Sequence, residues 1–139
     1  MVRLAEIGLL VVGVLAHAEA TSCTEIAAVP FTIKEPGAYC LKKSLTFAGG
    51  HRTIAVGSTD VPIDFGGTAI LVGANDVVID FRGHALDGTP AGPLSDAVGV
   101  RAHGRRNVTL RNGTIRGFHE GISLGGTSYV VEDLRLQRF

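Results

Sequence analysis

The chain has no tryptophan, one methionine and two cysteines, and its 139 residues carry a formal net charge of zero. A neutral chain lacks the excess positive charge that nucleic acid or an anionic membrane surface attracts, so neither is expected as a partner. Glycine is abundant instead, with 19 residues. This composition is typical of short strands joined by many tight turns.

The first twenty residues differ in character from the rest of the chain. Arg3 precedes an apolar stretch at residues 7–16, followed by the small-x-small sites Ala16-His17-Ala18 and Ala18-Glu19-Ala20. This order is typical of a secretory signal peptide, and the apolar stretch is too short to span a membrane as a helix. We therefore expect a signal peptide at 1–20 and one secreted or periplasmic domain at 21–139, without membrane contact after cleavage. The alternative is an uncleaved N-terminal anchor.

The two cysteines, Cys23 and Cys40, both lie just inside the predicted mature chain. An even number of cysteines in an exported protein favours a disulfide over two unrelated thiols. Closing a loop of this size would stabilise the fold by roughly 3 kcal/mol on the chain-entropy view. No histidine or third cysteine lies near enough in the sequence to form a metal cluster, so we predict a Cys23–Cys40 bridge and no metal ligands.

A repeat organises the C-terminal third of the chain. Residues 108–118 (VTLRNGTIRGF) align with residues 129–139 (YVVEDLRLQRF) at an offset of 21, so that Leu110 falls on Val131 and Ile115 on Leu136. Such a period indicates stacked repeats, and the alternation of apolar residues inside each copy indicates strands. Each coil of the chain is therefore expected to contain three short strands, with equivalent residues about 4.8 Å apart in successive coils.

The same three strands can be followed back to Thr68. The predicted first strands are 70–72, 100–102 and 122–124, the second are 77–79, 108–110 and 129–131, and the third centre on Leu86, Ile115 and Leu136. Outward residues then form two polar columns, which are Asp80, Arg111 and Glu132, and Asp87, Arg116 and Gln137.

The remaining segments are less regular. Residues 31–47 predict one earlier coil, and the glycine-containing loop 87–97 is interpreted as the one long excursion. Residues 48–66 have a less regular, glycine-rich sequence, and Pro62 there suits a bulge or an edge. Their expected core contacts are Ile54, Val56, Val61 and Ile63.

On the segments NVTLRNGTIRGF (107–118) and GISL (121–124), the chain resembles the right-handed parallel β-helix proteins of the pectin-lyase-like superfamily. The resemblance covers residues 31–139. It implies an all-β, single-stranded solenoid of about four coils with a disulfide-linked segment capping its N-terminal end. It also implies that Asn112 and Asp133 occupy the tight turn between the second and third strands, and that a polysaccharide cleft lies over the first strands.

The resemblance does not supply a catalytic site. Pectate lyases use carboxylates around calcium and an arginine base, whereas the outward positions of the first strands here are Leu71, Arg101 and Ser123. Calcium is therefore suggested by resemblance alone. Glycoside hydrolysis requires two carboxylates about 5–10 Å apart, which would have to come from loops. The catalytic candidates are Asp96 and Glu120 as carboxylates and Arg101 or His103 as proton acceptor; the substrate-binding candidates are Arg105, Arg106, Arg116, His119 and Asp87.

These observations predict a β-helix protein that binds or processes a polysaccharide. If the basic residues contact that polysaccharide, it is expected to be acidic, because basic side chains bind carboxylates. If it is an enzyme, it is a polysaccharide lyase or a glycoside hydrolase. The alternative is a non-catalytic binding or scaffold module, or an accessory protein like the periplasmic copper-site maturation factors that share the scaffold. Phe139 ends on a strand without a polar cap, which predicts an incomplete protein and self-association through an open last coil.

Overall fold

The computed structural model describes residues 22–49, 51–56, 59–64, 67–92 and 95–138, and it gives no side-chain description for 51–64. The predicted signal peptide lies outside the described residues. Within the described part of the chain, no helix is long and apolar enough to cross a membrane.

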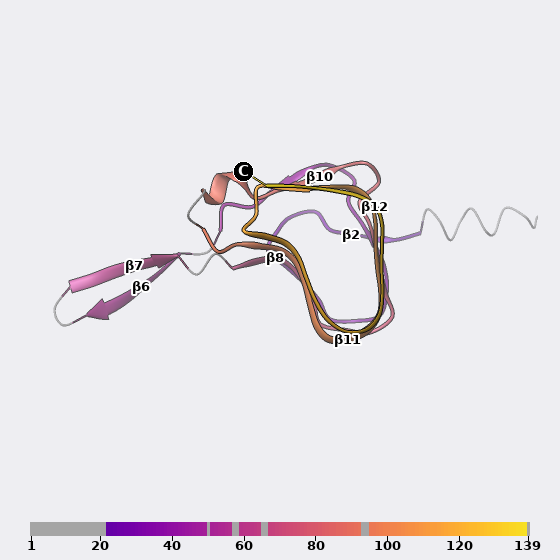
Figure 1. The fold of residues 1–139 in the computed structure, drawn as a ribbon, viewed down its shortest axis with the longest axis horizontal. Helices are drawn as coiled ribbons and strands as arrows, with labels where there is room; N and C mark the ends of the chain where they lie inside the picture. Colours follow the sequence, from indigo (N-terminus) through magenta and orange to yellow (C-terminus); the bar gives the residue numbers. More distant parts are fainter. Residues whose placement is uncertain (1–21, 50, 57–58, 65–66, 93–94, 139) are drawn as a thin grey trace, which may run out of the picture.

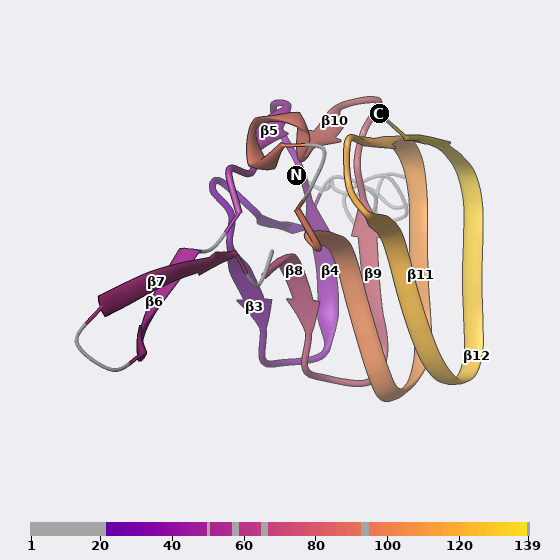
Figure 2. The same ribbon diagram turned by 60° about the vertical axis from the view of Figure 1, so that its left-hand side comes forward.

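The fold is all-β, and its main sheet contains nine strands that pair only in parallel. The sheet is so strongly curled that the backbone passes over itself in successive windings (Figures 1 and 2). This arrangement is compatible with a β-helix or another solenoid. The strands are β2 (Thr24–Glu25), β3 (Phe31–Ile33), β4 (Gly37–Cys40), β5 (Leu45–Thr46), β8 (Thr68–Val72), β9 (Val77–Asp80), β10 (Ala85–Asp87), β11 (Val98–Arg116) and β12 (Glu120–Gln137).

The strands pair in three columns. The first column is β3–β8–β11–β12, the second is β2–β4–β9–β11–β12, and the third is β5–β10–β11–β12. The long strands β11 and β12 belong to all three columns because they bend at each corner without a break in pairing. Leu110 pairs with Val131 and Ile115 with Leu136, so the predicted offset of 21 residues is confirmed.

One insertion explains an irregularity in this register. The pairing of β11 with β12 shifts between His103 and Arg105, which leaves Gly104 as an extra residue. Gly104 has a φ of 71°, a left-handed conformation that glycine adopts without steric cost. The five-residue sequence HGRRN therefore fits where the neighbouring windings have four residues.

The core is the column of inward aliphatic residues that the alternation predicted. Ile79, Leu110 and Ile115 are all buried, and Phe81 fills the corner between the second and third columns. On β12 the equivalent residues Val131 and Leu136 keep 45% and 54% of their surface exposed. They are exposed because no strand in the described part of the chain pairs with the outer edge of β12. Whether another chain covers this edge stays a prediction.

Residues 51–64 are more regular than their sequence pattern indicates. β6 (His51–Val56) and β7 (Thr59–Asp64) form a two-stranded antiparallel hairpin that extends away from the curled sheet (Figures 1 and 2). Pro62 lies opposite Thr53, and each strand of a two-stranded sheet is an edge, as its proline requires. The predicted core contacts of this segment concern side chains that lie outside the described part.

Loop 87–97 is consequently not the one long excursion. It contains a short 3₁₀ helix at Thr89–Ala91, and both this loop and the hairpin connect the third column to the first. The two excursions leave the curled sheet on the same side (Figure 1).

The predicted disulfide is confirmed. Cys23 and Cys40 are bonded, with Cα atoms 5.8 Å apart. The bridge ties the segment before β2 to the end of β4, where Ile26 is fully buried. Nη2 of Arg82 donates a hydrogen bond to Sγ of Cys23 at 3.0 Å, which connects this end of the molecule to the β9–β10 turn.

Candidate functional site

The outer face of the first column presents the side chains that the sequence singled out. Leu71, Arg101 and Ser123 occupy adjacent register positions on β8, β11 and β12. Arg101 is half-buried, and its Nε donates to Oγ1 of Thr68 at 3.3 Å. The guanidinium group is therefore held against the sheet, with its remaining donors available to a ligand.

His103 continues this face toward the next corner. Its Nε2 lies 2.9 Å from Oγ of Ser123, and the ring is exposed. A Cβ atom at Gly125, the register partner of His103, would lie 3.4 Å from the ring. This is an ordinary contact distance, so the imidazole lies directly against the neighbouring strand at Gly125.

The adjoining turn carries two more arginines. Nε of Arg105 donates to the carbonyl oxygen of His103 at 3.4 Å, and the backbone N–H of Arg106 donates to Oδ1 of Asn75 at 3.1 Å. The hydroxyl of Tyr129 lies 2.9–3.0 Å from three carbonyl oxygens of this region, including that of Arg105. The backbone of the turn is thereby fixed. We call Arg101, His103, Arg105 and Arg106 the basic cluster.

The acidic candidates lie at the opposite end of the first column. Asp96 and Glu120 are both exposed, and the backbone N–H groups of His119 and Glu120 donate to the carbonyl oxygen of Ala97 at 3.0 and 3.3 Å. Asp96 and Glu120 thus come from neighbouring windings, and their approach to within about 5–10 Å stays a prediction. Glu120 is the register partner of Val98, five residues before His103. At about 3.3 Å per residue, roughly 16 Å of strand separates the acidic candidates from His103.

Two further candidates lie on the third column. Nε of Arg116 donates to Oδ2 of Asp87 at 3.1 Å, and the backbone N–H of Thr89 donates to Oδ1 of Asp87 at 2.8 Å. Burial alone would raise the pKa of the Asp87 carboxyl, but hydrogen bonds from Thr89 and the hydrogen bond and charge of Arg116 outweigh it. The pKa therefore lies below its ordinary value of 3.8.

Asp87 gives a prediction for acid stability. A carboxyl whose pKa is lowered by folding contributes stability above its unfolded pKa, and that contribution is lost as the pH falls through the folded pKa. Asp87→Asn should therefore reduce the free energy of unfolding at pH 7 and weaken its decline below about pH 4. Urea unfolding at pH 7 and at several acidic pH values measures both effects. The exposed Asp96→Asn is the control, and equal pH profiles for both variants would contradict the assignment.

The resemblance suggested calcium, and the side chains of the first column do not fit that ion. Calcium prefers carboxylate and carbonyl oxygens, whereas the outward positions carry Leu71, Arg101 and Ser123. Across the described residues, no group of three or more histidine, cysteine, aspartate or glutamate side chains is arranged to hold a metal.

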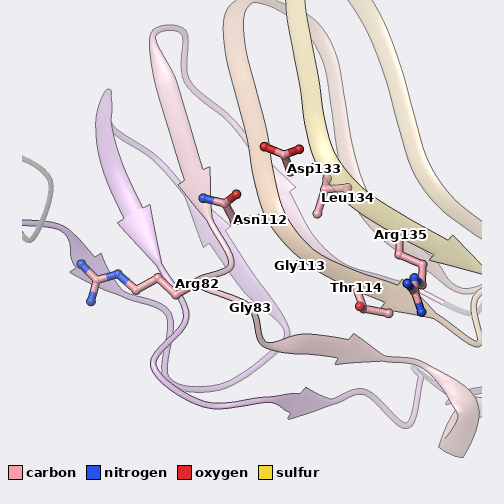
Figure 3. A pocket seen from close by; sticks show the side chains of 8 residues that line it. All are labelled: Arg82, Gly83, Asn112, Gly113, Thr114, Asp133, Leu134 and Arg135. Carbon is pink, nitrogen blue, oxygen red and sulfur yellow. The ribbon is translucent and has the colours of Figure 1, made fainter.

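A second feature, which the sequence analysis did not predict, is an open concavity of about 680 Å³ at the corner between the second and third columns (Figure 3). None of the predicted catalytic or substrate-binding residues lines it. The signal that was available is the predicted turn position of Asn112 and Asp133, which have left-handed φ values of 62° and 53°. The corner concavity is lined by Arg82, Gly83, Asn112, Gly113, Thr114, Asp133, Leu134 and Arg135.

A scan against protein-family models, a search of curated proteins and a search of solved structures found no match to this chain. Similarity therefore assigns neither a family nor an activity.

Proposed function

We propose that this chain is a secreted carbohydrate-binding protein that holds an acidic polysaccharide on the outer face of its first column. We further propose that the curled sheet is a right-handed parallel β-helix of the pectin-lyase-like kind, with about four coils. The parallel register at offsets of 21 and 31 residues and the left-handed turn residues Asn112 and Asp133 support this fold.

The observation that carries the proposal is the basic cluster. Its four side chains belong to six consecutive residues, 101–106, which lie within β11 on both sides of the irregularity at Gly104. Guanidinium groups form charge-assisted, often paired hydrogen bonds with carboxylates, and the hydroxyls of Ser123 and Thr68 offer partners for sugar hydroxyls. The backbone beneath these side chains is hydrogen-bonded to both neighbouring windings. It therefore loses little conformational entropy when a ligand binds.

The arrangement supports binding better than cleavage. A glycoside hydrolase needs two carboxylates on either side of one scissile bond, and a lyase needs a base beside the site that neutralises the substrate carboxylate. Asp96 and Glu120 lie at one end of the first column, Arg101 lies three register positions from Glu120, and His103, Arg105 and Arg106 lie at the other end. One sugar unit would not contact both groups, whereas an extended polymer lying along the strand would contact each in turn.

The test is the double variant Arg101→Ala with His103→Ala. Removing a charge-assisted donor and an imidazole from an exposed site should weaken binding to polygalacturonate about tenfold or more. Titration calorimetry or an immobilised-polymer assay measures the affinity. Raising the salt concentration should weaken wild-type binding more than variant binding, because the remaining attraction contains fewer ionic contacts.

The control is Arg138→Ala, which removes an exposed arginine outside the basic cluster. Unchanged affinity in the double variant, or an equal loss in the control, would remove the site assignment. Formation of unsaturated or shortened products during the same incubation would show that the protein processes its ligand as well as binding it.

A further inference from the structure

The corner concavity is an open surface depression whose volume would accommodate one small polar ligand. Its volume of about 680 Å³ falls within the range of about 300–1,000 Å³ that is typical of small-molecule sites. It lies on the turn between the second and third columns, so the ligand would not share a surface with the basic cluster. Three successive windings contribute to it.

The floor of the concavity is a rigid turn. The backbone N–H of Gly83 donates to the carbonyl oxygen of Asn112 at 2.7 Å, and the N–H of Thr114 donates to that of His84 at 3.1 Å. Fully buried Phe81 packs directly under Gly113, where an added Cβ would overlap with the Cβ of Phe81. Gly113 therefore lets the turn pack closely on Phe81, Gly83 adds no side chain to the concavity, and the hydrogen bonds hold the turn in place.

The side chains around this floor differ in position and in charge. Figure 3 shows Arg135 and Thr114 at one end, with Asn112 and Asp133 on adjacent windings along the rim. The guanidinium group of Arg82 points away from these four side chains, consistent with its hydrogen bond to Cys23. Arg135 is thus the cation of the concavity, and in the described part of the chain no hydrogen bond or ion pair occupies its guanidinium group.

We propose that the corner concavity binds a single uronic acid unit, a sugar that carries one carboxylate and several hydroxyls. Arg135 and the Thr114 hydroxyl bind the carboxylate, because a guanidinium group and a hydroxyl both donate to it. Asn112 and Asp133 bind the ring hydroxyls, because an amide and a carboxylate together accept and donate such hydrogen bonds. Leu134 supplies the small apolar surface against which a sugar ring packs.

This inference deepens the proposed function, since it names the sugar class and adds a second contact point on a different face. A polysaccharide bound at both places would gain affinity from the connection between them, provided that the chain is long enough to pass around the corner. A monosaccharide would bind at the corner concavity alone. The two sites can therefore be tested separately with ligands of different length.

The experiment is NMR titration of the mature chain with galacturonate and, in parallel, with galactose, which lacks the carboxylate. We expect galacturonate to shift the backbone amide signals of Gly83, Gly113 and Leu134, and galactose to bind more weakly. Arg135→Gln should weaken galacturonate binding about tenfold and remove the preference over galactose. Arg138→Gln, three residues further along the chain and outside the concavity, should leave both affinities unchanged.

The outcomes separate this inference from the proposed function. Galacturonate shifts that are unaffected by Arg135→Gln, equal binding of galactose and galacturonate, or no binding of either sugar would overturn the inference. If those shifts appear at Arg101 and His103 instead, the inference fails while the proposed function stands. If polymer binding is unaffected by the Arg101 and His103 double variant while the monosaccharide still binds at Gly113, the proposed function fails alone.

Discussion

Gly113→Ala is expected to lower the free energy of unfolding by about 3 kcal/mol, the upper part of the usual range for overpacking a tight site. The new Cβ atom would overlap with the Cβ of Phe81 and would lie 2.8 Å from the carbonyl oxygen of His84. Neither partner moves easily, because Phe81 is fully buried and His84 belongs to the hydrogen-bonded corner. Urea unfolding followed by circular dichroism measures the loss.

Gly125→Ala provides the matched control for this steric argument. Gly125 also lies on a long strand, but its added Cβ would meet only the exposed ring of His103, at an ordinary contact distance of 3.4 Å. Neither glycine has a left-handed backbone, so the two substitutions differ chiefly in the space available. A loss for Gly113→Ala no larger than that for Gly125→Ala would mean that the corner is less tightly packed than described.

Removing the disulfide is expected to cost about 3 kcal/mol, within the usual range of about 2–5 kcal/mol for small secreted domains. The two cysteines are 17 residues apart, so their bond removes loop entropy from the unfolded chain. It also holds β2, which contributes only two residues to the sheet and closes the core over Ile26. The variant Cys23→Ala with Cys40→Ala should show this loss together with faster amide exchange in β2.

Chemical reduction distinguishes the effect of losing the disulfide bond from the effect of replacing the two cysteine side chains. Adding a thiol reductant should destabilise the wild-type protein by a similar amount and should leave the double alanine variant unchanged. A double variant as stable as the oxidised wild type would contradict a structural role for the bridge. A loss confined to β2 exchange, with global unfolding unchanged, would mean that the first winding unfolds separately.

The register was predictable because it follows from a local pattern and a fixed distance. Alternating apolar residues identify a strand, and parallel strands pair about 4.8 Å apart, so the offset between Leu110 and Val131 also predicts which residues lie side by side. The same reasoning predicted the outward column of Leu71, Arg101 and Ser123. The disulfide was predicted from the cysteine count together with the expected export of the chain.

The hairpin could not be found in this way. Residues 51–64 do not continue the period of the windings, and their strands pair with each other instead of with the main sheet. The repeat pattern of the windings therefore does not predict these two strands. Only the antiparallel pairing in the folded chain identifies β6 and β7 as a hairpin.

The sequence by itself determined the windings, the inward and outward columns and the Cys23–Cys40 bridge, because each depends on spacing along the chain. The tertiary structure alone decided which polar groups converge. It separated Asp96 and Glu120 from His103 along the first column, and it placed Arg135 beside Thr114 at the corner concavity. Convergence depends on how far each winding turns at its corners and where each side chain then points, and neither quantity is encoded in a local period.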